Sequence, residues 1–269
     1  MRKRYALAII AAFFSVLVTG APVAAMGGFA PDCIKKTLPV TLTQGATQTY
    51  NVVGWLCAHG GFKDKTVQVL VSGFTYDHNY WDFPYQQYRY SYVQYATAAG
   101  YATFNIDRIG VGESSKPPAD QVTFPAEAYA TRQIVQALRD GKVGNTKFKK
   151  VVGVGHSMGA ATWILEAGTT YTDFTGPNVD GLVLTDYTHA TNLPFIIEIG
   201  GYRYPAAEDP KFANVGLPAG YITSKPNTRS IQFYNQSYAD PAVIAKDEEL
   251  KATATSGEAA TIPVARDPI

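Results

Sequence analysis

The sequence predicts an α/β fold, in which a mostly parallel β-sheet is flanked by helices. Three observations favour it. Short apolar runs, typical of strands buried on both faces, recur along the chain. Stretches with helical spacing of their apolar residues separate these runs, which is the order that crossover connections between parallel strands require. The 269 residues suffice for one large domain of this type, and they contain no internal repeat.

The predicted elements begin with a β-hairpin. Residues 37–56 alternate between apolar and polar side chains on either side of the turn sequence QGAT, as paired strands do. Residues 67–73 and 101–107 are apolar runs that predict buried strands. Between them, residues 85–100 carry aromatic and aliphatic side chains at helical spacing and end in Gly100, which predicts a helix.

The alternation continues to residue 186. An amphipathic helix is expected between Pro125, near its start, and Gly141, just past its end. Residues 150–155 (KVVGVG) predict a strand, residues 158–168 (MGAATWILEAG) a helix and residues 179–186 (VDGLVLTD) another strand.

The alternation of strands and helices is interrupted between residues 187 and 260, where proline, glycine and tyrosine are frequent. A connection of about 70 residues is long for a loop, so we expect it to have its own structure. It includes a short helix over residues 240–252, with Asp240 as its N-cap. We interpret residues 187–260 as a lid over a substrate pocket; a plain structural insertion is the alternative.

Residues 1–25 have the layout of a secretory signal peptide. Arg2, Lys3 and Arg4 precede an apolar run, and small residues end at Ala25, the expected cleavage point. An N-terminal membrane anchor is the alternative, because the run approaches spanning length. Cleavage would remove three basic residues and leave a net charge near −2. We therefore expect a secreted protein, and neither nucleic acid nor a membrane surface as a stable partner.

Both cysteines, Cys33 and Cys57, lie in the N-terminal β extension at residues 26–65. In an exported protein an isolated pair favours a structural disulfide, and two free buried thiols are the alternative.

Residues 155–159 (GHSMG) form the pattern G-x-S-x-G around Ser157. The motif places a serine on a strained turn between a strand and a helix, with its hydroxyl exposed. Here an apolar run precedes the pattern and a predicted helix follows it, which is the context that the motif requires. Ser157 is therefore the candidate nucleophile.

Three segments resemble the secreted α/β-hydrolases: VLVSGFTYDHNYWD, NIDRIGVGESS and GVGHSMGA. The resemblance covers residues 66–185 and implies that residues 66–269 form a hydrolase domain. It also implies that the amides of Phe74, with Thr75 beside it, and of Met158 form an oxyanion hole. This chain has Ser72-Gly73 where the family more often has His-Gly.

In this fold the triad runs in the order serine, acid, histidine. The residues around Asp267 resemble those around the family's acid, so Asp267 is our first choice for the catalytic acid. Asp186, which ends a predicted strand, is the second. The expected histidine has no counterpart, since none of the four histidines lies beyond His189. We expect that the chain lacks the C-terminal part of the fold; a substitute base is the alternative.

Three histidines could be that substitute. His189 lies at the mouth of the sheet and His78 beside the oxyanion loop, whereas His156 occupies a motif position that normally points away from the reacting centre. The stretch YDHNYWD at residues 76–82 predicts an aromatic-lined pocket. His78 is also a candidate pocket residue, together with Tyr76 and the lid tyrosines. These are Tyr202, Tyr204, Tyr221 and Tyr234.

The sequence supports no cofactor. Gly110-x-Gly112 lacks the third glycine of a dinucleotide loop, and no paired-ligand spacing predicts a metal site. The resemblance implies a serine hydrolase of small-molecule carboxylic esters that forms an acyl-enzyme at Ser157. The alternative is a non-catalytic protein that binds small molecules on the same scaffold. The sequence does not define the oligomeric state.

Overall fold

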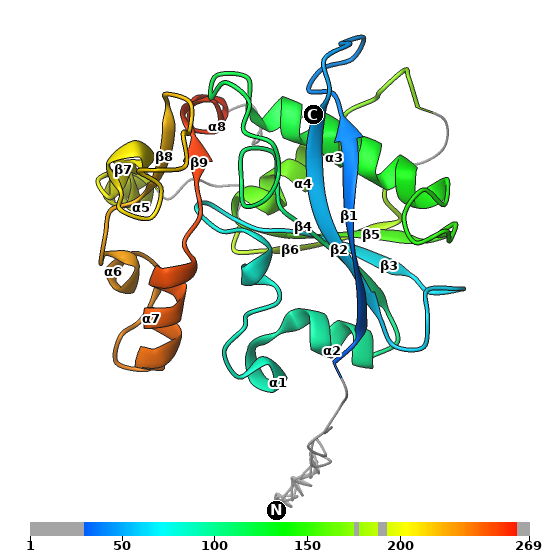
Figure 1. Ribbon diagram of the computed structural model, residues 1–269, viewed down its shortest axis with the longest axis horizontal. Helices are drawn as coiled ribbons and strands as arrows, with labels where there is room; N and C mark the ends of the chain where they lie inside the picture. The colour runs from blue at the N-terminus through cyan, green and yellow to red at the C-terminus, as the bar shows by residue number, and fades with distance from the viewer. Residues whose placement is uncertain (1–29, 175–177, 188–192, 263–269) are drawn as a thin grey trace, which may run out of the picture.

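The computed structural model describes residues 30–174, 178–187 and 193–262 (Figure 1). Its centre is a six-stranded sheet in the order β1-β2-β4-β3-β5-β6. β1 and β2 are antiparallel to their neighbours, and the other four strands are parallel. The strands are β1 (Asp32–Val40), β2 (Tyr50–Ala58), β3 (Val67–Val71), β4 (Ala102–Ile106), β5 (Val151–His156) and β6 (Gly181–Thr185).

Helices cover both faces of this sheet (Figure 1). On one face α3 (Phe124–Arg139) packs against α4 (Met158–Gly168), and the larger apolar core joins α3 and Trp163 to the strands. On the other face α2 (Tyr92–Ala98) contributes Val93 to a smaller core with Leu70. The predicted α/β class, with its mostly parallel sheet, is therefore confirmed.

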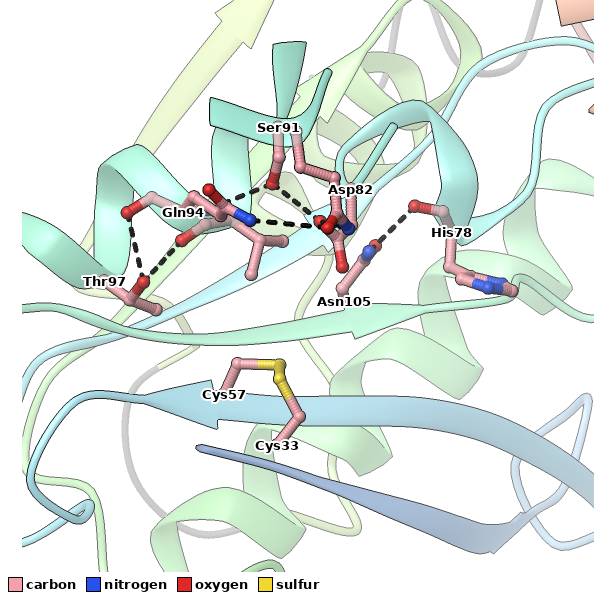
Figure 2. Close-up of a disulfide and its surroundings, with 10 residues drawn as sticks. Cys33, Cys57, His78, Asp82, Ser91, Gln94, Thr97 and Asn105 are labelled. Atoms are coloured by element: carbon pink, nitrogen blue, oxygen red, sulfur yellow. Dashed lines mark hydrogen bonds between the residues drawn. A yellow bond between two sulfur atoms is a disulfide. The ribbon is translucent and has the colours of Figure 1, made fainter. Parts of the chain in front are cut away.

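The helix expected over residues 85–100 is instead two helices, α1 (Gln87–Tyr90) and α2, divided at Ser91. Ser91 has an extended backbone, and its Oγ accepts a hydrogen bond from the Gln94 amide, as an N-cap does. Figure 2 shows the same hydroxyl donating to Asp82. These local bonds compete with a continuous helix.

The disulfide Cys33–Cys57 is present, as predicted (Figure 2). The two cysteines lie directly opposite each other on the antiparallel pair β1–β2. The link therefore ties the edge strand β1 to its neighbour β2.

Residues 203–262, named here the accessory segment, have their own secondary structure. Three short strands, β7, β8 and β9, form a separate antiparallel sheet, drawn beside the main sheet in Figure 1. Asp240 caps α7 by accepting from the Ala242 amide, as predicted. The elements here and just before are α5 (Leu193–Gly200), β7 (Arg203–Pro205), η2 (Ala206–Glu208), β8 (Tyr221–Ser224), α6 (Arg229–Phe233), α7 (Pro241–Leu250), β9 (Ala254–Thr255) and α8 (Ser256–Thr261).

The strand predicted over residues 179–186 forms as β6 but is not buried on both faces as expected. Within the described ranges it pairs only with β5, at the edge of the sheet. Leu182, Val183 and Leu184 are consequently 36%, 44% and 40% exposed. Across the described ranges no helix combines the length and the hydrophobicity needed to cross a bilayer.

Candidate active site

Ser157 occupies the sharp turn between β5 and α4. Its backbone has φ 53° and ψ −114°, a strained conformation for a residue with a side chain. Glycines on either side permit the turn: a Cβ on Gly155 would lie 2.5 Å from the Gly159 carbonyl oxygen, and a Cβ on Gly159 would lie 2.2 Å from that of Val71. The strained serine is therefore held by contacts that only glycine allows.

The loop after β3 lies against this turn. A Cβ on Gly73 would be 3.1 Å from the Cβ of Ser157, so the Gly73–Phe74 peptide is next to the candidate nucleophile. Met158 is the first residue of α4, and its N–H has no acceptor inside the helix. The two amides expected to bind an oxyanion, those of Phe74 and Met158, therefore belong to the segments that flank Ser157.

A buried arginine holds the Gly73 carbonyl. Arg108 Nη2 donates to it at 3.0 Å, and the Tyr76 amide donates to it at 3.2 Å. Because a peptide unit is planar and trans, fixing this carbonyl also fixes the direction of the Phe74 N–H. Arg108 is paired with two buried carboxylates, Glu127 at 2.6 Å and Glu258.

A second buried arginine holds the next turn of the loop. Arg229 Nη1 donates to Thr75 Oγ1 at 2.8 Å, and the Ala252 amide donates to the Thr75 carbonyl at 2.8 Å. Thr75 has φ 56°, a conformation that these contacts stabilise. The charge of Arg229 is balanced by a bidentate pair with Asp247, at 2.8 and 3.0 Å.

The ring of His156, the residue before the nucleophile, is held by partners other than Ser157. Its ring stacks on Tyr80 with centroids 4.5 Å apart, and its Nδ1 lies 3.1 Å from Thr185 Oγ1. Its Nε2 is 3.8 Å from a carboxylate oxygen of Asp186, whose side chain is 74% exposed. Burial lowers the pKa of His156, against the opposing charge of Asp186.

His78 is paired with Asp107. Its Nδ1 lies 2.8 Å from Asp107 Oδ1, and its ring stacks on Trp55 with centroids 3.8 Å apart. Burial alone would lower the pKa of His78, but the hydrogen bond and charge of Asp107 outweigh it and raise the pKa.

The chain does contain a group of side chains with metal-ligating atoms, which the sequence spacing did not indicate. Ligand atoms of Asp77, His78 and Asp107 lie within 4.8 Å of one another. Protein donors already occupy much of this group: Asp107 accepts from the amides of His78 and Glu113, and Asp77 accepts from Asn79. The hydrogen bonds tie together the loops that follow β3 and β4.

Neither His78 nor His156 forms a hydrogen bond with Ser157, and no other histidine does so within the described ranges. The remaining candidates for the triad, His189 and Asp267, lie outside the described residues.

Residues 68–267 match the alpha/beta hydrolase family. The chain belongs to this family. No curated protein matches the chain in sequence.

The fold of this chain is also found among solved structures. A protein from Rickettsia typhi has a TM-score of 0.53 and 12% identity, over 86% of this chain and 73% of that one. The alpha/beta hydrolase GrgF from Penicillium sp. sh18 has a TM-score of 0.43 and 11% identity, over 66% of this chain and 60% of that one. An esterase from Pyrococcus furiosus has a TM-score of 0.40 and 16% identity, over 55% of this chain and 48% of that one.

A cavity of about 220 Å³, named here the aromatic cavity, lies between the loop after β3 and the accessory segment. Of the residues expected to line a pocket, Tyr76 and Tyr234 do so, whereas His78, Tyr202, Tyr204 and Tyr221 do not line this cavity. The lining residues are Tyr76, Asp77, Asn79, Tyr80, Phe83, Tyr90, Tyr234, Val243, Asp247 and Leu250.

Asp77 and Tyr80 belong to the stretch YDHNYWD, which predicts an aromatic-lined pocket, and both line the cavity. Asp247 gave no such signal, because its place in the cavity depends on how α7 packs.

Proposed function

We propose that the protein is a serine hydrolase of carboxylic esters and that Ser157 is its nucleophile. The observation that carries the proposal is the strained backbone of Ser157 at the start of α4, with the Gly73–Phe74 peptide beside it. Donors fixed in advance around a developing negative charge are often the largest contribution to this kind of catalysis.

In the proposed reaction Ser157 Oγ bonds to the acyl carbon and passes its proton to a base. The carbonyl electrons move onto oxygen, where the amides of Phe74 and Met158 stabilise the charge. Collapse breaks the ester C–O bond, and the leaving alkoxide takes the proton. Water then attacks the acyl-enzyme by the same steps and releases the carboxylic acid and free serine.

We propose His189 only as a substitute base, for the case that the chain supplies its own histidine, with Asp267 as the first-choice acid and Asp186 as the second. The position of Asp186 directly after β6, 3.8 Å from the His156 ring, supports an acidic group near the carboxyl ends of the strands. We also propose that residues 1–25 direct export, which the disulfide supports because such links persist in oxidising compartments.

Intact-mass spectrometry with a fluorophosphonate probe tests the nucleophile. An adduct on the wild type that is absent from Ser157→Ala is the expected result. Labelling of both proteins would contradict the assignment, since the probe would then be attacking elsewhere. His78→Gln and His189→Gln, tested in parallel, identify the base, because its loss should slow labelling by orders of magnitude.

A second candidate is a non-catalytic protein that binds small molecules in the aromatic cavity. It is favoured by one observation: within the described ranges no histidine forms a hydrogen bond with Ser157. A folded wild-type chain that takes no probe, but binds a ligand in the cavity, would establish this function instead.

A further inference from the structure

The aromatic cavity lies near the two segments that carry the candidate active site. Tyr80 lines the cavity, and its ring stacks on His156, the residue before Ser157. Tyr76 lines it too, contacts Tyr80 edge to face with ring centroids 4.9 Å apart, and follows the loop residues Gly73–Thr75 in the chain. Ser157 does not itself line the cavity, so a substrate with one group in the cavity would extend past Tyr80 to bring its carbonyl to Ser157.

The walls of the cavity are mainly aromatic. Five of its ten lining residues are tyrosine or phenylalanine, with Val243 and Leu250 completing the apolar part. The faces of such rings carry partial negative charge and attract cations. At about 220 Å³ the cavity suits one compact group, because sites for larger ligands run about 300–1,000 Å³.

The two carboxylates of the cavity differ in their surroundings. Asp247 is neutralised by Arg229 through two hydrogen bonds. Asp77 has no ion pair in the described part of the chain: its Oδ1 accepts twice from Asn79, at 2.9 Å each, and its Oδ2 has no hydrogen-bond partner there. Burial, with the charge of Asp107 adding to it, raises the pKa of Asp77.

The nearest lysines do not supply the missing counter-charge by contact. Lys116 and Lys211 both feel the charge of Asp77. However, the Nζ of Lys116 donates to the carbonyls of Gly112 and Ser114, and the Nζ of Lys211 donates to those of Glu249 and Lys251. The charge of His78 also acts on Asp77, but His78 Nδ1 is paired with Asp107. Among the described residues, no cation therefore makes direct contact with the carboxylate of Asp77.

We propose that the aromatic cavity binds a substituted ammonium group, with Asp77 as its counter-charge. Aromatic faces attract such a cation, and its methyl groups suit the apolar walls. A neutral sugar or aryl group would leave the partly buried carboxylate without a counter-charge, which is unfavourable. The inference rests on the proposed function, which makes the ligand an ester whose cationic part lies away from the scissile carbonyl.

Isothermal titration calorimetry with tetramethylammonium chloride, at constant ionic strength, tests binding without requiring catalysis. The neutral comparison is 3,3-dimethyl-1-butanol. We expect tetramethylammonium to bind wild type about tenfold more tightly than Asp77→Asn or Phe83→Leu. Asparagine preserves the cap that Asp77 provides to η1 (His78–Tyr80), so that variant should fold.

Asp120→Asn is the matched control, because Asp120 is exposed and outside the cavity while the change in net charge is the same. Equal affinity of Asp77→Asn and Asp120→Asn for tetramethylammonium would overturn the inference. Equal affinity of the wild type for the cation and the neutral alcohol would also overturn it, since the cavity would then be simply apolar.

Hydrolysis of the acetate esters of choline and of 3,3-dimethyl-1-butanol separates this inference from the proposed function. These esters differ in charge and hardly in shape. A preference for the choline ester in kcat/KM that falls about tenfold in Asp77→Asn supports both proposals. Equal hydrolysis of both esters overturns the cation site alone. Cation binding without hydrolysis of either ester overturns ester hydrolysis alone.

Discussion

Replacing Glu127 with glutamine is expected to stabilise the protein increasingly as pH rises, by about 1 kcal/mol at pH 5 and about 3.5 kcal/mol at pH 7. Glu127 lies in a buried cluster with Arg108 and Glu258, one positive charge facing two carboxyl groups. Burial raises the pKa of Glu127 to about 8, against the opposing charge of Arg108, and the charge of Glu258 adds to the rise. The folded protein therefore keeps a proton that the unfolded chain releases near pH 4.3.

The sign follows from proton binding. Between about pH 4.3 and about pH 8 the folded state holds one more proton than the unfolded state, so the free energy of unfolding falls as pH rises. The slope for one proton is about 1.4 kcal/mol per pH unit. From pH 5 to pH 7 the fall assigned to Glu127 is about 2.5 kcal/mol.

Glutamine should fit the same site. Its Oε1 can accept from Arg108 Nη1, as Glu127 Oε1 does at 2.6 Å. Its amide can donate to Thr162 Oγ1, which now donates to Glu127 at 3.1 Å and has a second acceptor, the Met158 carbonyl, at 3.1 Å. The variant thus reproduces the protonated cluster at every pH.

Urea unfolding at pH 5, 6, 7 and 8 measures the effect. The difference in unfolding free energy between the variant and the wild type should grow across this range. Burial raises the pKa of Glu166 to about 7, so this residue also lowers stability as pH rises, but it does so equally in both proteins and cancels in the difference. Glu113→Gln, at an exposed position, is the control and should follow the wild type. A variant less stable than the wild type at every pH, with the same slope, would refute the reasoning.

Substitutions at three further sites test other parts of the fold. Gly159→Ala should destabilise the protein by about 3 kcal/mol, because its Cβ would meet the Val71 carbonyl oxygen at 2.2 Å; thermal unfolding reads this out, and an unchanged midpoint would contradict the tight packing. Replacing both Cys33 and Cys57 with serine should remove about 3 kcal/mol, given their separation of 24 residues, and reduction of the wild type should give the same urea midpoint. Asp240→Ala should cost about 1 kcal/mol and Asp240→Asn much less, since asparagine also caps helices; equal losses in urea unfolding would show that the cap does not stabilise α7.

The central sheet could be predicted from the sequence because its signals are local. The apolar runs of β3, β4 and β5 each report burial on both faces within a few residues. The motif around Ser157 is local too. A side chain on either of its glycines would clash with backbone atoms a few residues away or on the adjacent strand. A short window of sequence therefore contains most of the information about these elements.

The supports of the candidate site could not be predicted in this way. Arg108 contacts Glu258, 150 residues later, and Arg229 contacts Thr75, 154 residues earlier. No periodicity or spacing links such residues, because their encounter depends on how the accessory segment packs. The exposure of β6 is a similar case: its apolar run is that of a buried strand, and only the sheet order places it at an edge.

The same contacts fix the accessory segment to the body of the protein. A lid that opens must leave the body of the protein without breaking buried charge pairs, since each broken pair costs about 3–5 kcal/mol. Here Glu258 on α8 pairs with Arg108, which holds the Gly73 carbonyl. Arg229 on α6 reaches Thr75 directly.

Two points of the candidate oxyanion loop are thus held by side chains that depend on the accessory segment, and the Ala252 amide adds a backbone hydrogen bond to the Thr75 carbonyl. Moving residues 229–258 away would break these contacts and free the candidate oxyanion loop. These residues therefore support the candidate active site as a fixed part of the structure. Any motion that admits substrate must occur elsewhere in the chain.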